Sequence, residues 1–205
     1  MEGVWKRFSQ GYVLRGVSLR LEPGSVAVVE GPNGSGKTTL LRIIAGLTPP
    51  SRGLVVAGGG PVSYYPVRPL LYDELTVEEN LSYYSVISGL GSRGFEGVEA
   101  YWELGVDSYR GRRVGDLSHG WKRRVDLVRA LVNSPGVLLV DEPSTGLDAE
   151  ARRVLARQVA RLASKGSVVV VAAPLGDPFP GLLEVEGVEP EVYVLEGGVL
   201  RVKAS

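Results

Sequence analysis

The chain has 205 residues, with 23 Lys and Arg against 23 Asp and Glu and a formal net charge of zero. This balance excludes a bulk nucleic-acid coat and a polybasic membrane anchor, though not a local basic site. The absence of cysteine and the single histidine exclude disulfides, cysteine nucleophiles and multi-histidine zinc sites. No apolar run approaches the roughly 20 residues that span a bilayer. The first residues also lack the apolar stretch of a signal peptide, so we expect a cytoplasmic location.

Predicted strands alternate with predicted helices along the chain. Uninterrupted apolar runs, typical of a parallel sheet covered on both faces, occur at residues 26–30, 137–140 and 168–173. Helices are predicted at residues 37–47 and 148–165, the second with Asp148 as its N-cap and Gly166 at its end. This order implies an α/β sheet with right-handed crossovers.

The middle and the end of the chain have different patterns. Residues 76–79 form a capping box, which predicts a helix running to about Leu90. A glycine-rich break follows, and a shorter helix is predicted at residues 95–104. Residues 191–202 predict a β-hairpin. We therefore expect a single unit over residues 1–205 with a helical subdomain, residues 69–116, inserted into its α/β core.

Residues 31–38, GPNGSGKT, fit the P-loop pattern G-x-x-x-x-G-K-[ST] and lie between a predicted strand and a predicted helix, as that motif requires. Glycines let backbone N–H groups close around phosphate oxygens, and the helix N-terminus near Gly36 favours the same anion. Lys37 adds a charge at the β- and γ-phosphates, and the Thr38 hydroxyl can ligate Mg²⁺. The residues predicted to bind nucleotide here are Asn33, Gly34, Ser35, Gly36, Lys37, Thr38 and Thr39.

A pair of carboxylates, Asp141 and Glu142, follows the strand predicted at residues 137–140. Parallel strands place their carboxyl ends along one edge of the sheet, where ligands bind. Asp141 can therefore lie beside Thr38 and hold Mg²⁺ through water. Glu142 can polarise an attacking water and, with Lys37, is a predicted catalytic residue.

Further motifs make the chain resemble the ATP-binding subunit of ABC transporters, of a compact exporter-like type. Residues 117–121, LSHGW, resemble the family signature L-S-G-G-Q, and residues 144–148, STGLD, resemble its D-loop. Residues 14–24 match the usual approach to the P-loop, and residues 75–81 match the start of the helical subdomain. The resemblance covers residues 4–200 and implies a P-loop NTPase core with a mostly parallel sheet and an N-terminal antiparallel β part.

The resemblance implies a transport ATPase that uses ATP and Mg²⁺. Two such subunits enclose two ATP molecules, each between the P-loop of one subunit and the signature of the other. Phe8 falls where the family places an aromatic residue on adenine. Ser118 and Gly120 would face the partner's nucleotide, with Ser118 capping a helix at residues 120–132. The implied partners are an integral membrane subunit and a second cassette, identical or different, at the inner face of the cell membrane. No nucleic acid is expected.

The sequence departs from the family pattern at four positions. Val67 stands in place of a Gln that senses Mg²⁺ and water, and Pro174 or Ala173 stands in place of a His that contacts the γ-phosphate. Valine has no polar side-chain atom for either role. In the signature, His119 and Trp121 replace Gly and Gln. We therefore expect competent ATP binding but slow hydrolysis at this subunit's own site.

Several alternatives stay open from sequence. Residues 122–124 (KRR) either face a partner's nucleotide or form a solvated basic face. His119 is better explained as a tolerated variant at an exposed turn than as a nucleotide contact. Five tyrosines suit either a docking surface for the membrane subunit or packing within the subdomain: Tyr64, Tyr65, Tyr72, Tyr83 and Tyr84. The alternative functions are a nucleotide-binding regulatory or structural subunit with little turnover, and a soluble ABC ATPase unconnected with transport.

Overall fold

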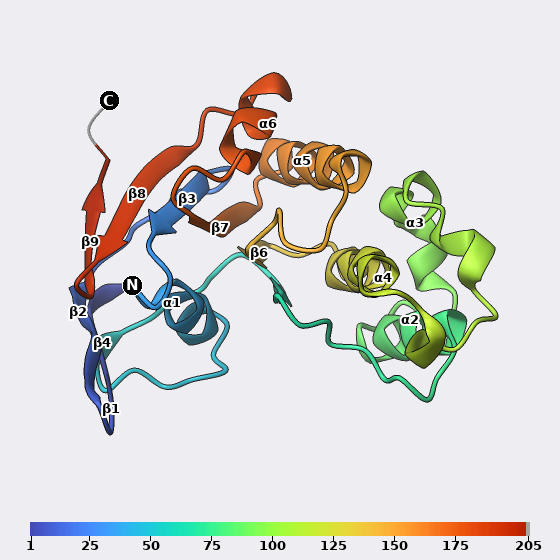
Figure 1. Cartoon of the computed structure of the whole chain (residues 1–205), viewed down its shortest axis with the longest axis horizontal. Coiled ribbons are helices and arrows are strands. Elements are labelled where there is room, and N and C mark those ends of the chain that lie inside the picture. The colour runs from blue at the N-terminus through green and yellow to red at the C-terminus, as the bar shows by residue number, and fades with distance from the viewer. Residues whose placement is uncertain (204–205) are drawn as a thin grey trace.

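A computed structural model describes residues 1–203 (Figure 1). A six-stranded sheet has the order β5-β6-β7-β3-β8-β9, and a three-stranded antiparallel sheet has the order β2-β1-β4. The larger sheet consists of β3 (Val26–Gly31), β5 (Val62–Tyr65), β6 (Val137–Asp141), β7 (Val168–Pro174), β8 (Glu191–Glu196) and β9 (Val199–Val202). The smaller sheet consists of β1 (Glu2–Phe8), β2 (Gly11–Val17) and β4 (Arg52–Leu54).

Helices cover the larger sheet and extend to one side of it (Figure 1). The α-helices are α1 (Lys37–Ile44), α2 (Val77–Ile87), α3 (Glu99–Glu103), α4 (His119–Leu131), α5 (Ala149–Ser164) and α6 (Phe179–Val185). Short 3₁₀ turns occur at Gly94–Gly97, Val106–Tyr109 and Val114–Asp116. None of the helices within residues 1–203 combines the length and the apolar character needed to cross a bilayer.

Strand β3 shows why the predicted strands are uninterrupted apolar runs. Its neighbours β7 and β8 both run parallel to it, and consecutive side chains point to opposite faces. Val26 and Val28 pack in one hydrophobic cluster with residues of α4 and α5. Ala27 and Val29 pack in a second cluster with residues of α1 and the smaller sheet. Both faces of the strand are therefore buried, as the sequence predicts.

Most predicted elements are confirmed. The strands at residues 26–30, 137–140 and 168–173 are β3, β6 and β7, and the hairpin is β8–β9. Asp148 caps α5 by accepting a hydrogen bond from the Ala151 N–H at 2.9 Å, and the capping box at Thr76 is present at the start of α2. Helix α1 is shorter than predicted and ends at Ile44, because Gly46 adopts a left-handed φ of 72°.

The predicted helix at residues 95–104 is wrong as a continuous element. A 3₁₀ turn at Gly94–Gly97 is followed by extended backbone at Val98, with φ −82° and ψ 111°, and only then by α3. The turn places Phe95 in the core with 1% of its surface exposed. Burial of this side chain and the glycines on either side of it disfavour a regular helix. Helix α6 was not predicted, because Pro178, Pro180 and Gly181 mask its short apolar pattern.

The α/β fold class is confirmed, with a mostly parallel sheet, an antiparallel N-terminal part and helices between α1 and β6. Residues 69–116 contain α2, α3 and the 3₁₀ turns, and no strand of either sheet. Their side chains share one hydrophobic cluster with β6 and β7. The boundary of a subdomain at residues 69–116 stays a prediction.

Candidate nucleotide-binding site

The candidate site lies where the parallel strands end. The backbone register pairs Tyr65 of β5 with Val140 of β6, and Asp141 of β6 with Ala172 of β7. On β3, Gly31 pairs with Pro174. Since all these strands run in the same direction, their last residues share one edge of the sheet. The P-loop, which follows β3, and the two carboxylates at the end of β6 therefore lie at this edge.

A hydrogen bond joins the two predicted metal-site residues. The Thr38 hydroxyl, in the first turn of α1, donates to Asp141 Oδ1 at 3.2 Å across 103 positions of sequence. Asp141 is 1% exposed. Burial raises the pKa of its carboxyl above the usual range, while the hydrogen bonds from Thr38 and Tyr64 oppose that rise. The site therefore contains a buried carboxylate whose two hydrogen bonds only partly compensate for its loss of contact with water.

The P-loop has the backbone that its glycines predict. Gly36, the N-cap of α1, has φ 106°, and a Cβ there would lie 2.9 Å from Val13 Cγ1, so another residue would clash as well as be strained. The Lys37 ammonium donates to the carbonyl oxygens of Gly31 at 2.7 Å and Pro32 at 3.0 Å. Burial lowers the pKa of Lys37, and the charges of Glu142 and Asp141 oppose this shift.

Glu142 has an unusual backbone conformation. Its φ is 48°, a left-handed value that a non-glycine residue adopts at a cost of about 1 kcal/mol or more. Its N–H donates to the Ala172 carbonyl at 2.8 Å, and its carboxylate accepts from the Thr145 hydroxyl at 2.9 Å. The turn thus fixes the carboxylate beside the end of β6, where a general base for water is expected.

These residues fit a nucleotide and a divalent cation. The Ser35 hydroxyl oxygen is buried and has no hydrogen-bond partner within residues 1–203, as expected for a donor aimed at phosphate. The Thr38 hydroxyl and the Asp141 carboxylate are oxygen ligands of the kind Mg²⁺ prefers, and it normally combines one or two carboxylates with substrate phosphates. No group of three or more His, Cys, Asp or Glu side chains suited to a metal occurs in the described part of the chain. The donor set therefore suits a cation carried in with a nucleotide.

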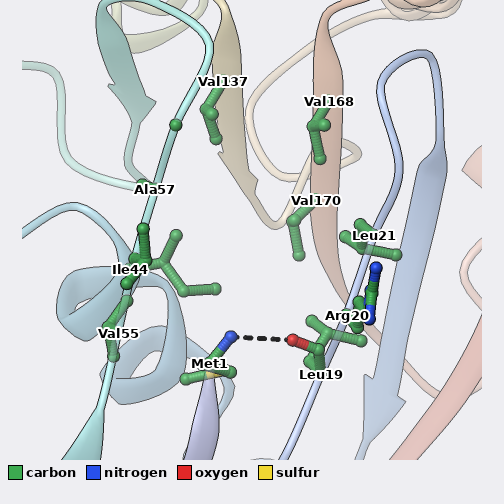
Figure 2. Close-up of a pocket in the computed structure, with 12 residues that line it drawn as sticks. Met1, Leu19, Arg20, Leu21, Ile44, Val55, Ala57, Val137, Val168 and Val170 are labelled. Atoms are coloured by element: carbon green, nitrogen blue, oxygen red, sulfur yellow. Dashed lines mark hydrogen bonds between the residues drawn. The ribbon is translucent and has the colours of Figure 1, made fainter.

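An apolar cavity of about 170 Å³ lies at the opposite edge of the sheet and is not this site (Figure 2). Val137 and Val168, the first residues of β6 and β7, line it together with Ile44 of α1. The Met1 ammonium donates to the Leu19 carbonyl at 2.8 Å on its rim. The P-loop follows the last residue of β3, and the carboxylates lie at the end of β6. The cavity and the candidate site therefore lie at opposite ends of the strands.

Val67 and Pro174 occupy the places that the resemblance predicts for them. Pro174 ends β7 beside Gly31, and Val67 follows β5 after Pro66. Both therefore lie at the edge that contains Asp141, and neither side chain can donate or accept a hydrogen bond. The polar contacts that the family pattern supplies from these positions are missing.

The structure places Phe8 on a hairpin that adjoins the P-loop. Phe8 pairs with Gly11 at the turn between β1 and β2, and its side chain is 47% exposed. The Lys6 ammonium lies 5.0 Å from the centre of its ring. The Val13 side chain in β2 lies against Gly36, so the hairpin is next to the loop. Adenine stacking on Phe8 stays a prediction.

The predicted signature residues lie at the start of α4, apart from α1 in the fold (Figure 1). Ser118 is the N-cap of α4, and its hydroxyl accepts from the Trp121 N–H at 3.4 Å, which confirms the predicted cap. Gly120 packs against the Gly146 carbonyl, and the exposed His119 side chain also lies against Gly146. The Trp121 ring packs on Tyr109 with centroids 3.9 Å apart. The P-loop and the signature are thus separate surfaces of the chain.

The solvated basic face considered for residues 122–124 is wrong for two of the three. Arg123 is fully buried, donates to the carbonyls of Pro66 and Glu142, and stacks over Tyr65 at 3.9 Å. Arg124 donates to the Leu104 carbonyl at 2.9 Å and to Asp148. No local sequence pattern indicates these long-range partners, which only the folded chain brings together.

The five tyrosines divide between packing and exposure. Tyr65 is buried, and its hydroxyl donates to the Arg123 carbonyl at 3.2 Å. The Tyr64 hydroxyl donates to Asp141 Oδ2 at 3.0 Å, a contact that sequence analysis missed. The Tyr84 hydroxyl donates to the Leu70 carbonyl. Tyr72 and Tyr83 are 46% and 44% exposed and touch edge to face.

Comparison with known proteins identifies the family. The sequence profile described as "ABC transporter" matches residues 14–145, which include the P-loop, the signature and both carboxylates. The chain belongs to the ABC transporter family. It is 35% identical to the Nod factor export ATP-binding protein I of Rhizobium etli over 95% of its own length, but it spans 64% of that relative. It is 31% identical to the ABC transporter ATP-binding protein NatA of Bacillus subtilis, over 83% of this chain and 75% of that protein.

Solved structures agree with this assignment. The ATP-binding subunit of an ABC transporter superposes with a TM-score of 0.86 at 25% identity, over the whole of this chain and 88% of that one. A dimeric ATP-binding cassette bound to ADP and phosphate has the same fold, with a TM-score of 0.80 at 23% identity over 98% of its length. The predicted family and the predicted P-loop fold are both confirmed.

The buried Asp141 predicts that its substitution stabilises the nucleotide-free chain. Because its pKa is raised in the fold, the folded state loses stability as the pH rises from the unfolded value of 3.8 through the folded one, and that loss is complete at neutral pH. Asp141→Asn keeps the shape without the charge. We expect the Tm at pH 7 to rise by about 2–4 °C, the shift that about 1 kcal/mol produces in a chain of this size, measured by calorimetry.

The exposed Asp116 supplies the matched control. Asp116→Asn makes the same change in net charge without removing a buried carboxylate, and we expect its Tm to stay within about 1 °C of the wild type. A lower Tm for Asp141→Asn than for Asp116→Asn would contradict the account of Asp141 as a costly buried charge.

Proposed function

We propose that this chain binds ATP with Mg²⁺ and hydrolyses it to ADP and phosphate, as the ATP-binding subunit of an ABC transporter. The Thr38–Asp141 hydrogen bond carries the proposal. It joins a P-loop hydroxyl to a buried carboxylate at the one edge of the sheet where phosphate donors, a cation ligand and a general base meet. The relatives named as ATP-binding transport proteins support the same function.

Each residue has a distinct part in this proposal. The P-loop N–H groups and Lys37 bind the phosphates, with Asn33, Gly34, Ser35, Gly36 and Thr39 completing the loop. Thr38 and Asp141, which are hydrogen-bonded to each other, would hold the cation, Asp141 either directly or through water. Glu142 accepts a proton from the attacking water. When bound there, the cation would supply positive charge to the phosphates.

Hydrolysis at this site is expected to be slow. Val67 and Pro174 offer no polar contact where a charge-stabilising donor would act, and losing one such donor costs about 10²-fold in rate. This observation also supports the second candidate, a nucleotide-binding regulatory subunit with little turnover. Glu142 favours the enzyme, since its carboxylate is held in place by Thr145.

The proposed partners are an integral membrane subunit and a second cassette. Ser118 and Gly120 lie at the start of α4 on a surface separate from the P-loop, so one chain does not close around a nucleotide by itself. A second cassette would supply a signature to each P-loop, with Ser118 and the N–H groups of α4 directed at phosphate. We place the assembly at the inner face of the cell membrane. The names of the Nod factor export relatives favour outward transport.

Two variants should affect nucleotide binding and ATP turnover separately. Lys37→Ala removes the charge at the phosphates and should weaken ATP binding at least about ten-fold. Glu142→Gln should keep the affinity within about two-fold and lower turnover about 10²-fold or more. For the wild type we expect about 0.1 per second or slower, against a median near 10 per second for enzymes. Calorimetric titration and phosphate release measure the two quantities.

The possible outcomes distinguish the candidates. Wild-type turnover of several per second would contradict the slow site. ATP binding with turnover no faster than that of Glu142→Gln would favour the regulatory subunit over the enzyme. No binding of ATP, with or without Mg²⁺, would contradict the proposed function as a whole.

The arrangement of the P-loop and the signature predicts self-association on ATP. In Glu142→Gln with Mg²⁺ and ATP, light scattering should show about twice the 21.9 kDa mass of one chain, and EDTA should restore the single-chain mass. Ser118→Arg should stay monomeric, because a bulky cation replaces the cap that faces the partner. A Glu142→Gln chain that binds ATP and stays monomeric would contradict pairing with a second identical chain.

A further inference from the structure

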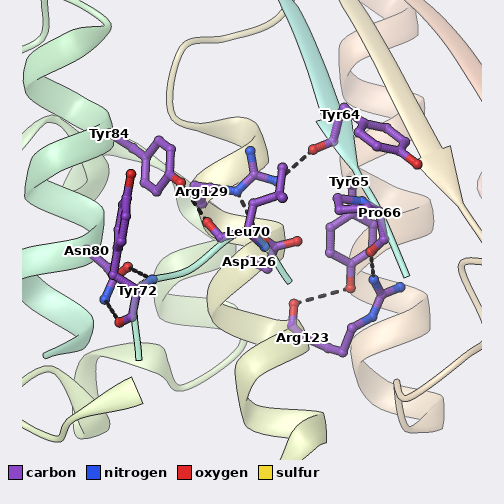
Figure 3. A network of polar contacts seen from close by, with 10 residues as sticks. All are labelled: Tyr64, Tyr65, Pro66, Leu70, Tyr72, Asn80, Tyr84, Arg123, Asp126 and Arg129. Carbon is purple, nitrogen blue, oxygen red and sulfur yellow. Dashed lines mark hydrogen bonds and ion pairs between the residues drawn. The ribbon is translucent and has the colours of Figure 1, made fainter. Parts of the chain in front are cut away.

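We propose that Tyr64 is a positioning residue for the cation at this site, orienting Asp141 from β5 while α4 holds Tyr64 in place. The inference rests on the proposed function and extends it to a residue outside the P-loop and the carboxylate pair. Figure 3 shows the Tyr64 carbonyl joined to Arg129 of α4, with the Tyr64 ring pointing away from Arg129.

The side chain of Tyr64 fixes one oxygen of the metal-site carboxylate. Its hydroxyl donates to Asp141 Oδ2 at 3.0 Å, while the Thr38 hydroxyl donates to Oδ1 at 3.2 Å. Two donors on different oxygens define the plane of the carboxylate. The phenol has a proton to donate, whereas an ionised carboxylate can only accept, so Tyr64 is the donor in this pair.

The main chain of Tyr64 is held in turn by α4. Its carbonyl accepts from Arg129 Nη2 at 2.6 Å. Arg129 also donates to Asp126 Oδ1 at 2.7 Å, and the side chains of this pair are 8% and 0% exposed. Asp126 Oδ1 accepts from the Leu70 N–H at 3.0 Å. A buried, hydrogen-bonded pair of this kind has little freedom to rearrange, so it sets the position of β5 and of the following loop together.

The contacts continue from α4 to α2. The Arg129 guanidinium lies 5.4 Å from the centre of the Tyr84 ring, and the Tyr84 hydroxyl donates to the Leu70 carbonyl at 2.7 Å. Tyr84 belongs to α2 (Figure 3). The orientation of Asp141 is therefore connected, through Tyr64 and Arg129, to the helical part of the chain.

The loop after β5 has no polar side chain at Pro66 or Val67 that could orient Asp141 in place of Tyr64. Pro66 and Val67 follow the strand and have no side-chain donor or acceptor. Within residues 1–203, the hydrogen bonds that reach the Asp141 carboxylate come from Thr38 and Tyr64. Removing a group that orients a metal ligand typically lowers the affinity for the metal 10–100-fold.

The test measures how much Mg²⁺ tightens nucleotide binding. The dissociation constant of a non-hydrolysable ATP analogue is determined by calorimetry in EDTA and in Mg²⁺, and the ratio of the two gives the coupling between cation and nucleotide. We expect Tyr64→Phe to lower this ratio about ten-fold and to leave the affinity in EDTA within about two-fold of the wild type. A purely structural role would weaken binding equally in both conditions.

Tyr65→Phe is the matched control, because it makes the same change one residue along. The Tyr65 hydroxyl donates to the Arg123 carbonyl at 3.2 Å and not to Asp141. We expect Tyr65→Phe to keep the wild-type ratio. Asp141→Asn should lower the ratio at least as far as Tyr64→Phe does. The double variant, which combines Tyr64→Phe with Asp141→Asn, should have the same ratio as Asp141→Asn alone, because Tyr64 acts through Asp141.

Three results would overturn the inference alone: an unchanged ratio in Tyr64→Phe, an equal loss in Tyr65→Phe, or a further loss in the variant that combines Tyr64→Phe with Asp141→Asn. In each of these cases the wild type still binds the analogue more tightly in Mg²⁺ than in EDTA, and the proposed function stands. A wild-type ratio near one would overturn both the inference and the Mg²⁺ part of the proposed function. A wild type that binds no analogue in either condition would instead contradict the proposed function itself.

Discussion

The hydrogen bond between Thr38 and Asp141 depends on the register of three parallel strands, β6, β7 and β3. Asp141 ends β6 and Thr38 begins the helix after β3, with β7 between the two strands. A shift of one residue in any of these pairings would turn the carboxylate to the other face of the sheet. The alternating burial of β3 in two separate clusters fixes that register. The hydrophobic core therefore determines the geometry of the polar edge.

The same edge concentrates features that cost folding energy. Asp141 is buried with a raised pKa, Lys37 is buried with a lowered one, and Glu142 has a left-handed backbone. In the proposed function, bound phosphates would offset the Lys37 charge and a bound cation would offset the Asp141 charge, so nucleotide binding would relieve a cost already present in the fold. Arg123 contributes from α4 by donating to carbonyls on both sides of the site, at Pro66 and Glu142. Helix α4 is thus packed directly against the turn that contains Glu142.

Local patterns predicted much of this arrangement from sequence. The P-loop spacing and the apolar runs are properties of adjacent residues, and both placed Thr38 and Asp141 correctly. The prediction of one continuous helix at residues 95–104 was wrong because burial of Phe95 overrides local helix propensity. Arg123 and Tyr64 could not be assigned, since their partners lie 57 and 77 positions away in the sequence. The charged run at residues 122–124 looked like a surface feature because polar residues at buried positions leave no periodic signal.

The most direct test of the central claim is a crystal structure of Glu142→Gln with Mg²⁺ and ATP. The account predicts phosphates on the N–H groups of residues 33–39 and the cation about 2.1 Å from Thr38 Oγ1, with Asp141 bound to it directly or through one water. It also predicts that the Tyr64 hydroxyl still contacts Asp141. A nucleotide bound elsewhere, or a cation that touches neither Thr38 nor the water shell of Asp141, would contradict the account.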